Sequence, residues 1–196
     1  MPAPARRRSR SRPRDATATR DRILRAARRQ FSELGYDQAG VRQIAAEAGV
    51  TAALINRYFG SKEGLFVEVL SGAFQLAGAL PEARSDFGAA LTRFISRNPP
   101  VPSPDGFDPL LLILRSITNP DALALLRDRL DRRTLEPLAA WLGGRDAGIR
   151  AGLVVATLMG FAILRKVLRS RVFKPGDEIR TMARLEPLLQ GLADLH

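Results

Sequence analysis

Apolar residues recur at helical spacing between residues 41 and 60. Val41, Ile44, Ala45 and Ala48 occupy positions i, i+3, i+4 and i+7, which puts them on one face of a short helix. We expect this face to pack inward, with the small side chain of Ala45 letting a second helix cross closely.

A second short helix is predicted directly after Gly49. Because glycine adopts the left-handed conformation at little cost, Gly49 can end the first helix, Val50 can fill the angle between the two, and Thr51 can cap the second. The inner side of this helix is expected to be Leu54, Ile55, Tyr58 and Phe59, and the outer side Ala52, Ala53, Asn56 and Arg57. Two short helices at a sharp angle form a helix-turn-helix, which places its second helix in the major groove of DNA.

The outer residues have the chemistry that a DNA groove requires. Arginine can form two hydrogen bonds with guanine, asparagine can do the same with adenine, and alanine allows close approach or contacts a thymine methyl group. An ordinary helical hairpin without a ligand is the competing interpretation.

Helices are also predicted before and after this pair. One should span residues 17–34, with Gly35 at its end, and another should follow Ser61, which is placed to cap it. A further amphipathic helix is expected over residues 85–98, before the proline-rich loop 99–106.

Two pairs of residues predict the starts of later helices. Asp108-Pro109 and Asn119-Pro120 each place a capping side chain before a proline in the first turn. Pro137 should kink the second of these helices and Gly143 should end it, and the last helix is expected over residues 177–195. The predicted fold class is therefore all-α.

The stretch GYDQAGVRQIAAEAGVTAALINRYFGSKEGLF, residues 35–66, resembles the DNA-binding domain of the TetR family of bacterial transcriptional regulators. The resemblance covers roughly residues 17–75. It implies base contacts by Arg42, Ala52, Ala53, Asn56 and Arg57, and phosphate contacts by Thr51, Tyr58 and Lys62. Members usually have threonine just before the second helix, where this chain has Ala39 and Gly40, so one hydroxyl contact to phosphate is missing.

The positive charge is concentrated in the same region. The net charge is +11, and residues 1–62 hold 14 Lys and Arg against 5 Asp and Glu, whereas residues 63–196 hold 17 against 15. A local basic surface indicates a polyanionic partner. Residues 1–16 are rich in arginine and are predicted to be a disordered arm, either tracking DNA or simply solvated.

Residues 151–164 contain no charge, but about 20 apolar residues are needed to cross a bilayer, so we expect a buried helix and no membrane partner. The TetR resemblance implies a homodimeric four-helix bundle built from the last two helices, residues 146–171 and 177–195. Its predicted interface residues are Gly152, Ala156, Gly160, Met182, Leu185 and Leu189. The alternative is that these helices only close the core of a monomer.

The resemblance also implies an effector pocket between the DNA-binding and dimerisation helices. Its expected wall is apolar with few charges, which favours a hydrophobic ligand. The predicted lining residues are Phe66, Leu70, Phe74, Phe94, Leu114, Ile117 and Trp141. Any one of them can instead be a packed core residue.

The chain has no cysteine and its one histidine is His196, so we expect no disulfide, metal site, cofactor or catalytic residue. We divide it into the arm (1–16), a three-helix helix-turn-helix DNA-binding domain (17–62) and a larger helical effector-binding and dimerisation domain (63–196). The predicted function is a cytoplasmic transcriptional repressor, released from an inverted-repeat operator in double-stranded DNA by a small hydrophobic molecule. The alternatives are a constitutive architectural DNA-binding protein without effector, and a helical enzyme or lipid-surface protein.

Overall fold

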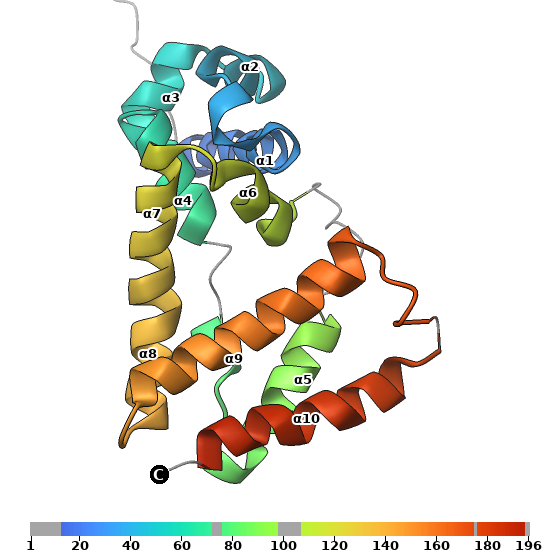
Figure 1. Cartoon of the computed structure of the whole chain (residues 1–196). Helices are drawn as coiled ribbons and strands as arrows, with labels where there is room; N and C mark the ends of the chain where they lie inside the picture. The colour runs from blue at the N-terminus through green and yellow to red at the C-terminus, as the bar shows by residue number, and fades with distance from the viewer. Residues whose placement is uncertain (1–12, 72–75, 98–106, 175, 195–196) are drawn as a thin grey trace, which may run out of the picture.

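The computed structural model describes residues 13–71, 76–97, 107–174 and 176–194, and every regular element in these ranges is a helix. The α-helices α1–α4 gather at one end of the molecule, and α5, α9 and α10 lie at the other (Figure 1). Their bounds are α1 (Pro13–Gln38), α2 (Val41–Glu47), α3 (Ala52–Phe59), α4 (Lys62–Ser71), α5 (Phe87–Arg97), α6 (Pro109–Ser116), α7 (Pro120–Leu130), α8 (Glu136–Leu142), α9 (Ala147–Ala162) and α10 (Glu178–Asp194). Two short 3-10 helices, η1 (Leu76–Ala79) and η2 (Arg84–Asp86), precede α5, and two π-helical segments, η3 (Asp131–Leu135) and η4 (Ile163–Val167), follow α7 and α9.

Helix α1 begins earlier than the sequence suggested. Residues 13–16 were expected to belong to a disordered arm, but they form its first turn. Proline is favoured there because its fixed φ is helical and its missing N–H is not needed, and Asp15 interacts with the positive end of the helix dipole. The expectations for residues 1–12 lie outside the described residues. Gly35 interrupts the helix as predicted, with φ of 74°.

A first hydrophobic core joins α1–α4 to α6 and α7. Phe31, Ile44, Ile55 and Phe66 are fully buried in it, and the rings of Phe31 and Phe66 meet edge to face at 5.0 Å. Leu112 of α6, Leu126 of α7 and Ala122 complete the same core. Helix α1 therefore packs on α6, and α4 packs on α7, while α2 and α3 share the same core.

The predicted starts of α6 and α7 are confirmed. The Asp108 carboxylate accepts hydrogen bonds from the backbone N–H groups of Leu110 (2.9 Å) and Leu111 (3.2 Å). The Asn119 side chain accepts one from Ala122 N–H at 2.8 Å, and a proline occupies the first turn of each helix. These caps satisfy backbone donors that have no partner within the helix.

One nearly continuous column of helix, residues 120–142, connects the two ends of the molecule (Figure 1). We call this segment, α7–η3–α8, the rod. Its π-helical turn, Asp131–Leu135, directly precedes Pro137, whose ring would clash with the carbonyl of Arg133 in an unbroken α-helix. The predicted kink is thus taken up by a widened turn, and Gly143 ends the rod as expected.

The second core lies among α5, α8, α9 and α10. Phe87 and Trp141 stack there at 4.9 Å, and Leu91, Leu142 and Val154 are fully buried. Arg84 donates to the carbonyls of Leu142 (2.6 Å) and Ala193 (2.8 Å). Arginine therefore satisfies carbonyls near the ends of α8 and α10, where the helix dipole favours positive charge.

The helix formed by α9 and η4, Ala147–Val167, has 21 residues and is the one described helix that is long and apolar enough to cross a membrane. The prediction that this helix is too short to cross a bilayer is therefore wrong. However, a core helix passes the same test, and Val154, Leu158 and Ala151 of α9 pack in the second core.

Candidate nucleic-acid interface and ligand cavity

The turn between α2 and α3 has the geometry predicted for a helix-turn-helix. Gly49 adopts φ of +65°, and its N–H donates to the carbonyl of Ala46 at 3.1 Å. The N–H of Val50 donates to the carbonyl of Ala45 at 2.9 Å. Ile44 of α2 and Ile55 of α3 are fully buried in the first core. This close packing fixes the orientation of the two helices, and of their outer faces, relative to each other.

The outer face of α3 carries most of the predicted base-contact residues. Ala53, Asn56 and Arg57 are exposed, and so is Arg42 on α2. Ala52 is half-buried and packs against the first core, so it presents less surface than expected. The exposed set combines two guanidinium groups, one amide and a small side chain, which is the chemistry that reads base edges.

The three predicted phosphate-contact residues lie at the two ends of α3. Thr51 is exposed and occupies the N-cap position, although its hydroxyl makes no capping hydrogen bond. Tyr58 is half-buried against the first core. Lys62 follows α3, and its Nζ donates to the carbonyl of Asp37 at 3.3 Å and lies 4.5 Å from the centre of the Tyr36 ring.

Several basic residues of α1 are used to hold the domain together. Arg20 forms an ion pair with Glu68 at 2.6 Å, and Arg29 pairs with Glu47, which also accepts a hydrogen bond from Gln30 at 2.7 Å. Arg22 is different, because it is exposed and its guanidinium lies next to the Gly49 turn. Arg22 is therefore the candidate phosphate contact of α1, because its guanidinium lies beside the turn that precedes α3.

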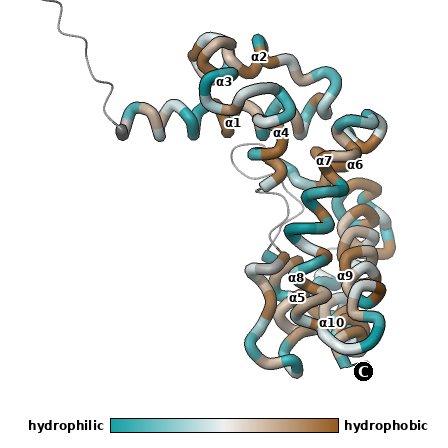
Figure 2. The backbone as a smooth tube through the Cα atoms, turned by 90° about the vertical axis from the view of Figure 1, so that its left-hand side faces the viewer, coloured by the Kyte–Doolittle hydropathy of each residue, from teal (hydrophilic) through white to brown (hydrophobic). Residues whose placement is uncertain are grey.

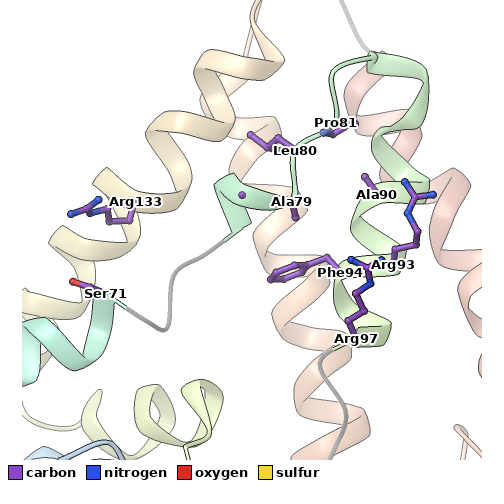
Figure 3. A pocket seen from close by; sticks show the side chains of 10 residues that line it. Ser71, Ala79, Leu80, Pro81, Ala90, Arg93, Phe94, Arg97 and Arg133 are labelled. Atoms are coloured by element: carbon purple, nitrogen blue, oxygen red, sulfur yellow. The ribbon is translucent and has the colours of Figure 1, made fainter. Parts of the chain in front are cut away.

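A cavity of about 740 Å³ lies at the junction between the rod, α5 and the end of α4 (Figure 3). Ser71, the last residue of α4, forms part of its wall. Arg93, Phe94 and Arg97 of α5 line it on one side and Arg133 of the rod lines it on the other, with the Arg133 side chain extending away from α5 (Figure 3). The remaining lining residues are Gly78, Ala79, Leu80, Pro81 and Ala90.

The structure does not bring the predicted effector-pocket residues around this cavity. Among those that the structure describes, only Phe94 lines it. Phe66 and Leu70 are fully buried in the first core. Trp141 packs in the second core, where its indole N–H donates to the carbonyl of Pro81 at 3.1 Å. Leu114 is half-buried, Ile117 is 43% exposed, and Phe74 lies outside the described residues. Large apolar side chains fill the cores, because burying them there stabilises the fold most.

The three arginines of the cavity were not predicted from the sequence. The expected wall carried few charges, whereas Arg93, Arg97 and Arg133 all line the observed one. One signal was available: Arg93 and Arg97 stand at i and i+4 on a helix, Phe87–Arg97, that contains no Asp or Glu.

The predicted dimer residues divide into two groups. Gly152, Ala156 and Gly160 lie along a face of α9 that no described helix covers, and a Cβ added at Gly152 or Gly160 would meet nothing within 4 Å. The same face carries Ile149, Leu153 and Leu164, which are 65%, 49% and 44% exposed. We call this face, residues 149, 152, 153, 156, 160 and 164, the open face of α9.

On α10 the prediction fits less well. Met182 and Leu185 are half-buried, and Leu189 is fully buried in the second core, so Leu189 belongs to the single chain's interior. The most exposed large apolar residues of α10 are Ile179 (84%) and Leu188 (56%). Within the described ranges, no three His, Asp or Glu side chains gather closely enough to hold a metal ion.

The chain matches two models of known families. Residues 23–69 match the bacterial regulatory proteins of the tetR family, and residues 86–192 match the tetracyclin repressor-like C-terminal domain. Among curated proteins, the HTH-type transcriptional repressor NicS of Pseudomonas putida is 46% identical over 55 residues, which are 28% of this chain and 26% of NicS. The match thus spans about a quarter of that relative's length.

Solved structures match over nearly the whole chain. A TetR-family regulator from Streptomyces coelicolor is 26% identical with a TM-score of 0.59, covering 94% of this chain and 99% of that one. A transcriptional regulator from Saccharomonospora viridis, solved in complex with choline, is 23% identical with a TM-score of 0.57, covering 89% and 96%. Because the C-terminal family model alone spans more than half of the chain, the protein belongs to the TetR family and is a DNA-binding transcriptional regulator, not an enzyme.

Proposed function

We propose that this protein is a homodimeric repressor that leaves an inverted-repeat operator when a small molecule with an apolar body occupies the cavity. The observation that carries the proposal is the position of Ser71, which ends α4 and forms part of the cavity wall. Helix α4 packs in the same core as α2 and α3. A ligand that moves the end of α4 therefore acts on the helix-turn-helix.

The DNA-binding end is tied to the rest of the chain at two further places. Arg115 of α6 donates to the carbonyls of Ser32 and Glu33 near the end of α1. Asn119, which caps the rod, donates to the Asp37 carboxylate at 2.6 Å. A displacement of the rod is therefore transmitted to α1, and with it to the surface formed by Arg42, Asn56 and Arg57.

The dimer is proposed to form through the open face of α9 together with α10. The two helices lie next to each other on one side of the molecule (Figures 1 and 2). Only 28% of the most apolar 18-residue stretch within the helix comprising α9 and η4 is buried in the single chain. A second copy that covers this face would remove apolar surface from water and bring two helix-turn-helix units onto one DNA duplex.

The Saccharomonospora regulator shows that this fold can hold a small molecule, in that protein the choline cation. The lining of the present cavity includes three arginines and no Asp or Glu. A quaternary ammonium ligand is therefore disfavoured here by repulsion between like charges.

Two experiments in sequence test the proposal. Selection of bound duplexes from random DNA should recover an inverted repeat, which can then be used to screen small molecules for DNA release. Uniform affinity for all duplexes would show a constitutive architectural protein instead. If a specific site is recovered but no small molecule releases the protein from it, the protein is still a sequence-specific regulator. The proposed release by a ligand would then be rejected.

A further inference from the structure

The cavity has a strongly one-sided charge. Ten residues line it, of which three are arginines and none is acidic. None of the three arginines forms an ion pair with a carboxylate among the described residues. Three guanidinium groups around one hollow raise the local concentration of anions.

The arginines of α5 are arranged around an aromatic ring. Figure 3 shows Arg97 running back along α5 toward Phe94, whereas Arg93 and Arg133 extend from the rim. Phe94 is half-buried and also packs against the second core, so its position is fixed. A ligand that contacts Phe94 thus lies beside the Arg97 guanidinium.

Apart from Ser71, the rest of the wall is apolar. Leu80, Pro81 and Ala90 lie on the same side of the cavity as Phe94 (Figure 3). The volume, about 740 Å³, lies within the range of roughly 300–1,000 Å³ that is usual for small-molecule sites. An inorganic ion would leave most of this space and all of the apolar wall unused.

We propose that the cavity binds an organic anion whose carboxylate is held by Arg97, with Arg93 and Arg133 adding attraction, and whose apolar body lies against Phe94 and Leu80. The proposal rests on the proposed function in one respect: it names the chemical class of the effector. A carboxylate is the matching group because the planar guanidinium fork can donate two parallel hydrogen bonds to its two oxygens.

The three arginine side chains are exposed, so water and salt reach the site. The preference for an anion should accordingly weaken as ionic strength rises, because salt screens exposed charges. The contact with the apolar wall does not depend on salt in this way. Selectivity for the head group and affinity for the body are therefore separable in a binding experiment.

The test uses the full-length protein without DNA and three matched pairs of probes: 4-phenylbutyrate, 2-naphthoate and decanoate, each compared with its neutral primary amide. Isothermal titration calorimetry at low salt should show at least one carboxylate binding about tenfold or more tightly than its amide, the ratio expected when one charge-assisted hydrogen bond is gained. Inorganic phosphate should not compete at the same concentration. Equal binding of acid and amide in all pairs, no binding of any carboxylate, or competition by phosphate would each overturn the proposal.

Variants locate the site. Arg97→Gln should reduce carboxylate affinity to that of the amide, and Arg93→Gln and Arg133→Gln should reduce it less. The matched control is Arg132→Gln, because Arg132 is adjacent to Arg133 but pairs with Asp128 at 2.8 Å and does not line the cavity. Loss in Arg132→Gln equal to that in Arg97→Gln would show a general charge effect and reject the site. Arg97→Glu should reverse the preference, so that 4-phenylbutylammonium binds better than 4-phenylbutyrate.

A second readout separates this inference from the proposed function. The best carboxylate is added to the protein bound to its selected duplex, and DNA release is measured. Binding that depends on Arg97 without DNA release would uphold the anion site and reject effector-controlled release. Release by neutral compounds that is unchanged in Arg97→Gln would uphold the regulator and reject the anion site.

Discussion

Lys62 is held in place at the point where α3 meets α4. Its ammonium group lies over the Tyr36 ring and donates to the Asp37 carbonyl, while the Tyr36 hydroxyl donates to the Glu63 carboxylate at 2.8 Å. Burial lowers the pKa of Lys62, and the nearby Asp37 and Glu63 carboxylates oppose that shift. A cation fixed in this way next to the predicted recognition helix is suited to a sequence-independent phosphate contact.

Replacing Arg57 and replacing Lys62 should therefore have different effects on DNA binding. Arg57→Ala should relax the preference at one base pair by about 1–3 kcal/mol, because an arginine that forks onto guanine reads that base alone. Selection from random duplexes measures this as loss of one position in the recovered site. An unchanged site would contradict the role of Arg57 as a base contact.

Lys62→Gln should weaken all duplexes alike. Loss of one phosphate contact should lower the slope of log affinity against log salt concentration by about 1 and leave the recovered site the same. Filter binding over a range of salt concentrations gives the slope. Arg145→Gln is the control, because the Arg145 side chain is 89% exposed and Arg145 lies between α8 and α9, outside the helix-turn-helix. A similar change in that variant would show a general effect of net charge.

The Glu63 carboxylate makes the stability of the DNA-binding end depend on pH. A hydrogen bond from Ser61 is the main reason that the pKa of Glu63 is lowered, and the Tyr36 hydroxyl contributes. Because the folded-state pKa lies below the unfolded value of about 4.3, this stabilisation is present above that pH and is lost as the pH falls through the folded-state pKa. Urea denaturation should show that Glu63→Gln is less stable than wild type near pH 7 and that the difference shrinks near pH 3.

Tyr36→Phe is the companion variant for this prediction. It removes one of the hydrogen bonds that lower the pKa of Glu63 and keeps the aromatic packing with Phe31 and Phe66. Its stability should fall less than that of wild type as the pH decreases. A wild-type minus Glu63→Gln difference that stays constant between pH 7 and pH 3 would show that the carboxylate has no role in the fold's acid sensitivity.

At this scale the sequence predicted which residues of α3 are exposed better than it predicted the cavity. Asn56 and Arg57 are exposed where the helical periodicity placed them, because a short amphipathic helix determines its own outer face. Their contacts with DNA remain a prediction. The cavity is formed by residues distant in sequence, such as Ser71, Arg97 and Arg133, whose meeting depends on how four elements pack. Periodicity along one helix contains no information on that packing.

Close packing of α1 against α6 depends on one glycine. Gly35 has φ of 74° and ψ of −178°, a region that almost only glycine occupies, and an added Cβ would lie 2.4 Å from the carbonyl oxygen of Arg115. That oxygen belongs to the backbone of α6 and cannot move aside alone. The contact between the two helices therefore tolerates no side chain at this position.

Gly35→Ala should lower the free energy of unfolding by about 1–3 kcal/mol from backbone conformation alone, and by more once the clash is included. Urea denaturation measures the loss. Gly191→Ala is the opposite control, because Gly191 lies within α10 with open space around it, and alanine there should stabilise the helix by about 0.5–1 kcal/mol. Two changes of the same sign and size would contradict the special role of Gly35.

The boundaries of elements were predictable where a local signal exists. Asp108, Asn119 and Gly143 begin or end helices as expected, since capping and chain reversal are decided within a few residues. The widened turn at Asp131–Leu135 was predicted only as a kink at Pro137. Its exact form depends on the packing of the rod against α9 and η1, which no short stretch of sequence specifies.

The single chain leaves the open face of α9 exposed to water. Ile149 and Leu153 are 65% and 49% exposed, and a Cβ added at Gly160 would meet no described atom within 4 Å. Gly160→Glu should therefore leave the fold of the single chain intact while placing a charge in the proposed dimer interface, where burying it is costly. Sedimentation should show monomers for Gly160→Glu and dimers for Ala140→Glu, a control on an exposed position of α8.

A stable Gly160→Glu dimer would show that the interface lies elsewhere. It would favour the alternative interpretation, in which α9 only closes the core of the single chain. Circular dichroism and thermal unfolding of both variants are needed beside sedimentation. Helical content equal to that of Ala140→Glu, together with a cooperative unfolding transition, would show that Gly160→Glu has lost association and not its fold, because a Cβ added at position 160 meets no described atom within 4 Å.

Two coupled helix-turn-helix units impose a spacing on the operator. One unit contacts only a few base pairs, which gives too little specificity against the many competing sites of a genome. A two-fold dimer that docks both α3 helices on one face of the duplex needs half-sites about 34–36 Å apart, or one helical turn.

Inserting about five base pairs between the half-sites turns one of them to the opposite face of the DNA, so wild-type affinity should fall to that for a single half-site. Inserting about ten base pairs restores the face but lengthens the distance, and it should recover affinity only if the dimer can open by a further turn. The Gly160→Glu monomer should bind all three duplexes equally. Wild-type binding that ignores the five-base-pair insertion would show that the two units are not coupled, and the inverted-repeat operator would then have to be abandoned.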